Sequence, residues 1–401
     1  MNFRSDRQVG KAAITLLLAY AAYISLGLPD TILGVAWPFI RREFVSPVTY
    51  AGIMTALITS FSALSSFGSG FVLRRIGTGR LLAICGLITG SALFAASFAP
   101  SFPFLLLLCI PLGLGGGAID VGMSHYVASH FTSRHMSWLH GSWGIGATMG
   151  TSVVTLLIGL GFTWRTGYAV IGSIQLLLAA AFFLTIPLWS NGKTASSGEM
   201  PKDHPVDSGK VVMSVRFWTC ALLFFVYCSI ENSVGLWGYQ LLTRIYGVSA
   251  HTAGYFVSSF WGGLMAGRFL IGSVANRIGN RKLIRISIIG VMLGGILLIL
   301  TSSKLVALLA LLLVGFSFAS IYPSMMHETP RRFNRATAVT LMGIQSGAGI
   351  LGFGVAPSIV GFVAAHTTFG ILPYLILVFG LIMFGLQVVV DGWALSNKPE
   401  E

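Results

Sequence analysis

The segment G-F-V-L-R-R-I-G at residues 70–77 returns in altered form as G-S-V-A-N-R-I-G-N-R-K at residues 272–282. Each copy follows a long apolar run, and the second begins 202 residues after the first. The same offset places Gly113, Ile119, Met123 and His125 on Gly315, Ile321, Met325 and His327, and Gly141 and Gly150 on Gly343 and Gly352. One offset that serves three separate regions indicates two halves related by duplication.

The composition is that of a membrane protein. Of 401 residues, 55% are apolar and 9% are charged, and the mean hydropathy is +0.82. An ordinary soluble domain has roughly 25% charged residues, so a soluble enzyme, a disordered chain and a secreted disulfide scaffold are excluded. The 25 basic residues are scattered between apolar runs, which is a topology signal and not a nucleic-acid surface. The four cysteines lie in apolar stretches and are interpreted as buried hydrophobes, and we expect neither a metal nor a cofactor.

A membrane-spanning helix needs about 20 apolar residues, and the sequence offers twelve candidates. They cover residues 12–40, 48–73, 81–99, 102–128, 137–160, 166–189, 217–243, 252–275, 283–302, 304–326, 336–363 and 368–391. The first has the charge layout of a signal peptide, but it is too long for one and we interpret it as a retained helix. The long polar connection predicts a bundle at 1–190, a cytoplasmic linker at 191–216 and a second bundle at 217–401.

The distribution of Lys and Arg predicts the orientation. With the N-terminus in the cytoplasm, Arg268 lies within a span and almost all the other basic residues fall on the cytoplasmic side. The exceptions are Arg41, Arg42, Arg165, Arg244 and Lys304. Because cytoplasmic loops carry an excess of Lys and Arg, we expect both termini in the cytoplasm.

The repeated segments resemble the loop after the second and eighth helices of the major facilitator superfamily, G-x-x-x-D-R-x-G-R-[RK]. Arg74 and Asn276 stand in place of its acid, and the alternative is two basic loops that happen to begin with glycine. The resemblance implies an all-α membrane protein with twelve transmembrane helices in two pseudo-symmetric six-helix bundles. It also implies a site between the halves near the midplane, and a multi-pass protein of the bacterial inner membrane.

Three of the twelve acids lie deep in apolar spans: Asp30 in the first, Asp120 in the fourth and Glu231 in the seventh. An ionised side chain at the bilayer centre costs at least ~2.5–3.5 kcal/mol. We expect no basic partner for these acids, because no cation shares their helices at similar depth. An unpaired acid in this setting favours its neutral form and can carry a proton, so all three are candidates for proton coupling. The alternative is a neutral acid that only hydrogen-bonds between helices.

The surroundings of these acids narrow the resemblance to the fucose–proton symporter family. The similar segments are Gly27-Leu28-Pro29-Asp30, Gly34-Val35-Ala36-Trp37-Pro38, Gly113-Leu114-Gly115 with Asp120, His140-Gly141-Ser142-Trp143-Gly144, Tyr227 with Glu231 and Trp237, and Ser320-Ile321-Tyr322-Pro323. By resemblance, Asp30 and Asp120 carry proton coupling and contact the sugar. Ser124, Trp138 and Gly141 replace that family's Asn, Gln and Asn, so the sugar contacts differ and fucose itself is not implied.

Further polar and aromatic side chains are candidates for substrate binding. The full set is Asp30, Trp37, Asp120, Trp138, His140, Glu231, Asn232, Trp237, Tyr322 and Gln345. Rings stack on the C–H faces of a sugar, and amides bind hydroxyls. Glu231 and Asn232 would orient the substrate or serve a second proton. For the rings, core packing is the alternative, and for His140, Asn232 and Gln345 it is hydrogen bonding between helices.

These observations predict a secondary transporter, active as a monomer in the lipid bilayer, that moves a small polar solute, best a sugar or sugar derivative, with protons by alternating access. A proton-driven exporter of amphipathic drugs is the alternative within the same fold. Sodium coupling and export also stay open. A membrane enzyme built on His140 and Ser142 is disfavoured, because residues two apart on a helix point about 200° apart. A channel would require charged rings or carbonyl filters, and the sequence has neither.

Overall fold

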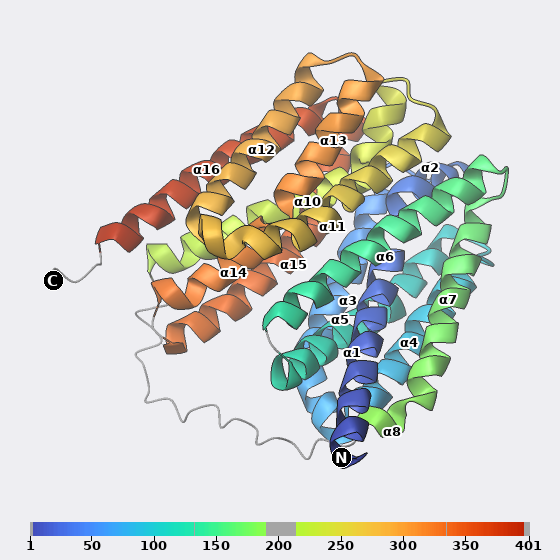
Figure 1. Cartoon of the computed structure of the whole chain (residues 1–401). Coiled ribbons are helices and arrows are strands. Elements are labelled where there is room, and N and C mark those ends of the chain that lie inside the picture. Colours follow the sequence, from blue (N-terminus) through green and yellow to red (C-terminus); the bar gives the residue numbers. More distant parts are fainter. Residues whose placement is uncertain (1–2, 132, 190–213, 334, 397–401) are drawn as a thin grey trace. The chain divides into compact units, whose positions relative to one another are not determined.

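A computed structural model describes residues 3–131, 133–189, 214–333 and 335–396, and these residues contain helices and no strands. Their contacts divide the chain into two compact units (Figure 1). Unit 1 comprises Met1–Pro47 and Leu57–Gly198, and unit 2 comprises Val48–Ala56 and Glu199–Glu401. Most of the predicted linker 191–216 lies outside the described residues, and its last two residues already belong to a helix.

Unit 1 is a bundle in which α1 packs mainly on α6, and α4 packs on both α5 and α7 (Figure 1). Its helices are α1 (Phe3–Asp30), α2 (Ile32–Glu43), α3 (Tyr50–Ile76), α4 (Thr78–Ala96), α5 (Phe102–His130), α6 (Ser133–Gly159), α7 (Trp164–Leu184) and α8 (Ile186–Trp189). The first turns of α3 are grouped with unit 2.

In unit 2, α10 packs mainly on α15 and α16, α11 on α13, and α12 on α13 and α16. Its helices are α10 (Val215–Arg244), α11 (Ala250–Ile278), α12 (Asn280–Leu300), α13 (Lys304–Phe318), α14 (Ile321–Arg332), α15 (Arg335–His366) and α16 (Ile371–Ser396). All four cysteines are buried and free, as the sequence predicted.

Ten stretches of the described residues are helical, long and apolar enough to cross a membrane, and residues 50–66 of α3 form a shorter apolar helix. The predicted count of twelve therefore stays a prediction. Two of the ten spans are interrupted: 12–43 breaks between α1 and α2, and 304–329 breaks between α13 and α14. The second break precedes Pro323, whose ring nitrogen has no N–H to donate to the carbonyl of residue 319. The first break leaves Asp30 as the last residue of α1.

The duplication is visible in how two glycines pack. A Cβ atom built at Gly113 in α5 would overlap the carbonyl oxygen of Ile58 in α3. A Cβ atom built at Gly315 in α13 would overlap the carbonyl oxygen of Phe260 in α11. Gly315 follows Gly113 by 202 residues, and Phe260 follows Ile58 by the same number. The two units thus contain the same close helix contact, which only a glycine allows.

We expect Gly315→Ala to lower the free energy of unfolding by about 1–3 kcal/mol, because the new methyl group must push α11 and α13 apart. Gly385→Ala is the matched control, since a Cβ atom there has nothing within 4 Å. Thermal unfolding of the detergent-solubilised protein measures both variants. Equal melting temperatures for the two would show that the contact at Gly315 is not tight.

Candidate functional site

Asp30 ends α1 with an exposed side chain. Its Oδ2 atom accepts a hydrogen bond of 2.8 Å from the indole Nε1 of Trp143 in α6. The position follows from the break after Asp30, where Thr31 leaves the helix and donates from its hydroxyl to the carbonyl oxygen of Ala147 at 2.8 Å. An exposed carboxyl group inside a membrane-spanning stretch is therefore held by a neutral donor.

Asp120 lies in α5, and its side chain is also exposed. The hydroxyl of Tyr23 in α1 donates to its Oδ1 atom at 2.6 Å. The same hydroxyl lies 2.7 Å from Oγ of Ser124, one helical turn after Asp120. The ring of Tyr23 meets the ring of His140 in α6 edge to face, with centroids 5.4 Å apart. Tyr23 therefore joins α1, α5 and α6 around one carboxyl group.

The carboxylates of Asp30 and Asp120 lie close enough to interact electrostatically. Within the described part of the chain, neither forms an ion pair. The donors that hold them, an indole and a phenol, are uncharged, so either acid can gain or lose a proton without separating a salt bridge. The pair is therefore held by hydrogen bonds from neutral side chains.

Glu231 is placed differently, in the interior of unit 2. Its side chain is 2% exposed, and its Oε2 atom is buried without a hydrogen-bond partner among the described residues. The expectation that it has no basic partner is wrong, because Arg268 of α11 interacts with its charge and Tyr227 contacts its carboxyl group. Glu231 and Arg268 lie in consecutive helices, far apart in the sequence, and the packing of α10 against α11 brings them together.

The predicted aromatic candidates divide into buried and half-buried rings. Trp37 packs edge to face on Phe102 and is buried. Trp237 is also buried, and its Nε1 donates to the carbonyl oxygen of Pro357 at 2.8 Å. Both rings therefore belong to the cores of their units. Trp138 and Tyr322 are half-buried.

The two amide side chains among the predicted site residues form hydrogen bonds within unit 2. Asn232 donates to the carbonyl oxygen of Phe353 at 2.6 Å. Gln345 is buried and accepts from the hydroxyl of Thr329 at 3.0 Å. Of the predicted site residues, the structure thus brings together Asp30, Asp120 and His140 in unit 1. It places Glu231, Asn232 and Gln345 in unit 2.

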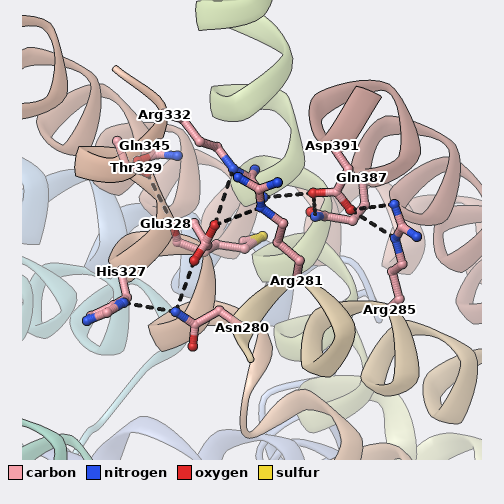
Figure 2. A network of polar contacts seen from close by, with 11 residues as sticks. Asn280, Arg281, Arg285, His327, Glu328, Thr329, Arg332, Gln345, Gln387 and Asp391 are labelled. Carbon is pink, nitrogen blue, oxygen red and sulfur yellow. Dashed lines mark hydrogen bonds and ion pairs between the residues drawn. The ribbon is translucent and has the colours of Figure 1, made fainter. Parts of the chain in front are cut away.

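A network of ion pairs, which sequence reasoning missed, joins the ends of α12, α14 and α16 (Figure 2). Arg332 lies between two carboxylates, with Nη2 at 2.9 Å from Oδ1 of Asp391 and Nε at 3.7 Å from Oε2 of Glu328. Arg285 contacts Asp391 at 2.8 Å, and Arg281 contacts Glu328 at 3.1 Å. Both carboxylates are almost fully buried. The network therefore ties three helix ends of unit 2 into one body.

Neutral side chains complete this network (Figure 2). Asn280 donates to Glu328 at 3.1 Å and lies 2.9 Å from Nδ1 of His327, and Gln387 donates to Asp391 at 2.9 Å. Glu328 and Asp391 stand at the ends of predicted spans, where hydropathy does not separate a buried helix end from a solvated one. A signal was present in the repeated motif, because Asn280 and Arg281 belong to its G-N-R-K end.

The side chains that hold the two exposed acids, Tyr23 and Trp143, were also absent from the predicted site residues. Tyr23 precedes Asp30 by seven residues, two turns of the same helix, and that spacing is the available signal. Trp143 belongs to the segment at 140–144 that resembles the symporter family. Its role as a donor to Asp30 depends on how α6 packs on α1.

We expect Asp391→Asn to lower the free energy of unfolding by about 3–5 kcal/mol, because it leaves Arg332 buried beside one carboxylate instead of two. Glu43→Gln is the matched control, since Glu43 pairs with Arg165 at 2.6 Å but its side chain is 40% exposed. Partly exposed pairs contribute about 0–1 kcal/mol. Thermal unfolding of both variants checks the difference, and equal losses would show that burial does not set the strength of the network.

Comparison with known proteins assigns the chain to a family. The family model of the Major Facilitator Superfamily matches residues 19–344 and 219–400. The cis,cis-muconate transport protein of Acinetobacter baylyi is 22% identical over 372 residues, with 89% of each chain covered.

Solved structures show the same fold. An inward-facing, unoccupied bacterial homologue of the human lysosomal transporter Spinster has a TM-score of 0.75 at 15% identity, over 97% of this chain and 98% of that one. A D-xylose–proton symporter has a TM-score of 0.73 at 15% identity, over 92% and 96%. With the family model matching nearly the whole sequence, this chain is a multi-pass membrane transporter that belongs to the Major Facilitator Superfamily.

Proposed function

We propose that this transporter moves a small polar solute, best a sugar or sugar derivative, together with protons by alternating access. The observation that carries the proposal is the pair of exposed carboxyl groups, Asp30 held by Trp143 and Asp120 held by Tyr23. Both acids lie in apolar helices, where an unneutralised charge is costly. Their retention is explained if each gains and loses a proton during transport.

The two acids act as one pair in the proposed mechanism. A proton on either one relieves their mutual repulsion, and a conformation that binds the proton more tightly becomes more populated. A solute hydroxyl that donates to the other carboxylate relieves the repulsion in a similar way. Proton and solute binding are thereby coupled through one pair of side chains. Glu231 is buried in unit 2, where Arg268 interacts with its charge, and there it would orient the solute or serve a second proton.

A sugar is favoured by the resemblance of the segments around Asp30, Asp120 and His140 to the fucose–proton symporter family. The aromatic side chains beside both acids agree with this, since rings bind the apolar faces of sugars. The D-xylose–proton symporter shares the fold. We further propose cytoplasmic termini, a monomeric state and a bacterial inner membrane, on the distribution of Lys and Arg and on the same resemblance.

A small organic anion is the second candidate. The relative from Acinetobacter baylyi is named for transport of muconate, a dicarboxylate. An anion would bind beside Asp30 and Asp120 only when these acids are protonated, so it too would be coupled to protons.

Uptake into proteoliposomes under an imposed pH gradient tests the coupling. We expect Asp30→Asn and Asp120→Asn to lose proton-driven accumulation by roughly tenfold or more, because each change removes a titratable group and a charge-assisted hydrogen bond. Exchange of labelled solute without a gradient should persist in at least one variant. Glu43→Gln, which alters an acid paired with Arg165, should accumulate solute as the unaltered protein does.

The substrate class is decided in the same assay by a panel of hexoses, pentoses, dicarboxylates and lipophilic cations. Accumulation of sugars that both Asp→Asn changes abolish supports the proposal. Accumulation of dicarboxylates alone selects the second candidate. Proton-driven transport of lipophilic cations alone, with no transport of sugars or dicarboxylates, indicates an exporter of amphipathic drugs. Full accumulation by both variants would contradict proton coupling through these acids.

A further inference from the structure

Arg268 is a cation inside α11, in the stretch 252–275 that the sequence predicts to cross the membrane. Its side chain is half-buried. A charge at such a depth needs compensation, and Arg268 interacts with the charge of Glu231 in α10. The proposed transport mechanism gives a role to Glu231, but none to the guanidinium group that interacts with it.

Close packing places Arg268 next to an interrupted helix. A Cβ atom built at Gly267 would overlap Cβ of Ala319, which lies in the break between α13 and α14. On α10, a Cβ atom built at Gly235 would overlap the ring of Trp261 in α11. Arg268 directly follows Gly267 in the sequence. Its helix is therefore held against both α10 and the break.

Three aromatic rings lie at the same break. The hydroxyl of Tyr227 donates to the carbonyl oxygen of Phe318, the last residue of α13, at 3.5 Å. The ring of Tyr227 packs on the ring of Phe318, with centroids 5.5 Å apart, and on that of Tyr322 in α14, at 6.1 Å. Tyr227 also contacts the carboxyl group of Glu231. Interrupted helices bind solutes in many transporters, and this interruption combines an acid, a guanidinium group and aromatic rings.

The carboxyl group of Glu231 has fewer hydrogen-bond partners than the acids of the ion-pair network. Glu328 and Asp391 each accept hydrogen bonds from at least two side chains. In contrast, Oε2 of Glu231 is buried and has no hydrogen-bond partner among the described residues. A buried oxygen without a donor costs free energy. Less free energy therefore opposes the exchange of Glu231 for another carboxylate as the counterion of Arg268.

We propose that Arg268 recognises the solute, and that the solute carries a carboxylate group. The assignment rests on the proposed function and narrows its solute to a hydroxylated organic acid, such as an acidic derivative of a sugar. When Glu231 takes up a proton, its attraction for the guanidinium group is lost, and the carboxylate of the solute replaces it. One proton and one negative charge thus enter together. A guanidinium group binds a carboxylate through two parallel N–H···O bonds, which a neutral sugar cannot form.

The groups around Glu231 determine the pH dependence of this exchange. Arg268 faces it from α11, and Tyr227 and Cys228 interact with it from its own helix. Tyr322 of α14 contacts Tyr227, and the charged residues of α14 that the structure describes belong to the ion-pair network. The titratable residues of α13, α15 and α16 lie toward the ends of those helices. Because each carboxylate enters with one proton on Glu231, binding strengthens as the pH falls, until the solute itself becomes protonated.

Binding is measured by isothermal titration calorimetry of the detergent-solubilised, full-length protein, so that no proton gradient is involved. Each neutral sugar is paired with its uronic acid, for example glucose with glucuronate and galactose with galacturonate, and a dicarboxylate series is included. The best acid is expected to bind on the order of tenfold more tightly than its neutral partner, because it gains charge-assisted hydrogen bonds. A neutral sugar that binds as tightly as its acid, or a panel in which no acid binds, would overturn the proposal.

Glu231→Gln tests the exchange, because glutamine keeps the shape of the side chain but does not compete for the guanidinium group. The variant should bind the acid at least as tightly as the unaltered protein. Titrations in buffers of different ionisation enthalpy should show one proton fewer taken up per acid bound. The ligand-free variant should melt at a lower temperature, and the acid should restore it. Weaker binding of the acid would show that Glu231 is itself a solute contact and would overturn the exchange.

The double variant Arg268→Gln with Glu231→Gln removes both charges together, so that no buried acid is left without its partner. It should lose the roughly tenfold preference for the acid and keep its affinity for the neutral sugar. Arg244→Gln is the control, since Arg244 is exposed at the end of α10, and it should keep the preference. An unchanged preference in the double variant would place the carboxylate elsewhere and overturn the assignment.

Two further comparisons keep these outcomes distinct. If the double variant does not fold, the proton count of Glu231→Gln decides, and an unchanged count overturns the exchange. Full proton-driven accumulation by Asp30→Asn and Asp120→Asn would contradict the proposed function, whereas equal binding of sugar and acid contradicts only the role of Arg268.

Discussion

A charged side chain in hydrocarbon is stable only if a partner, water or a proton compensates its charge, and this constraint organises the polar chemistry of the molecule. The few acids within or beside the described spans meet it in two ways. In unit 1, Asp30 and Asp120 are exposed and held by neutral aromatic donors. In unit 2, Glu328 and Asp391 are buried and held by guanidinium groups. The first arrangement holds its acids by hydrogen bonds from neutral groups, while the second holds them by ion pairs.

The two units therefore share one duplicated scaffold but carry different polar groups on it. The helix contact at Gly113 and its counterpart at Gly315 has survived in both, whereas the polar groups have diverged. Near the ends of α12 and α16, unit 2 concentrates its arginines around two carboxylates. Backbone contacts are retained because a Cβ atom would break them, while side-chain partners can be exchanged in pairs.

The architecture was predictable because hydropathy and the repeat act over many residues, so single errors do not matter. The sequence also singles out Asp30 and Asp120 as candidates, since few acids occur within spans. Their partners were not, because which face of α6 carries Trp143 toward α1 depends on helix rotation. Trp237 illustrates another limit: a ring in a core and a ring lining a site give the same sequence signal. The electrostatic interaction between Glu231 and Arg268 depends on how α10 and α11 are aligned, which the sequence does not specify.

The network in unit 2 also constrains how the sequence can drift over time. Three arginines share two carboxylates there, and Arg332 contacts both. Loss of either acid leaves the buried Arg332 beside one carboxylate instead of two, so a replacement that keeps the network stable needs a compensating change among its partners. We expect these positions to change together rather than singly. Epistasis of this kind would make the helix ends of unit 2 more diagnostic of ancestry than of cargo.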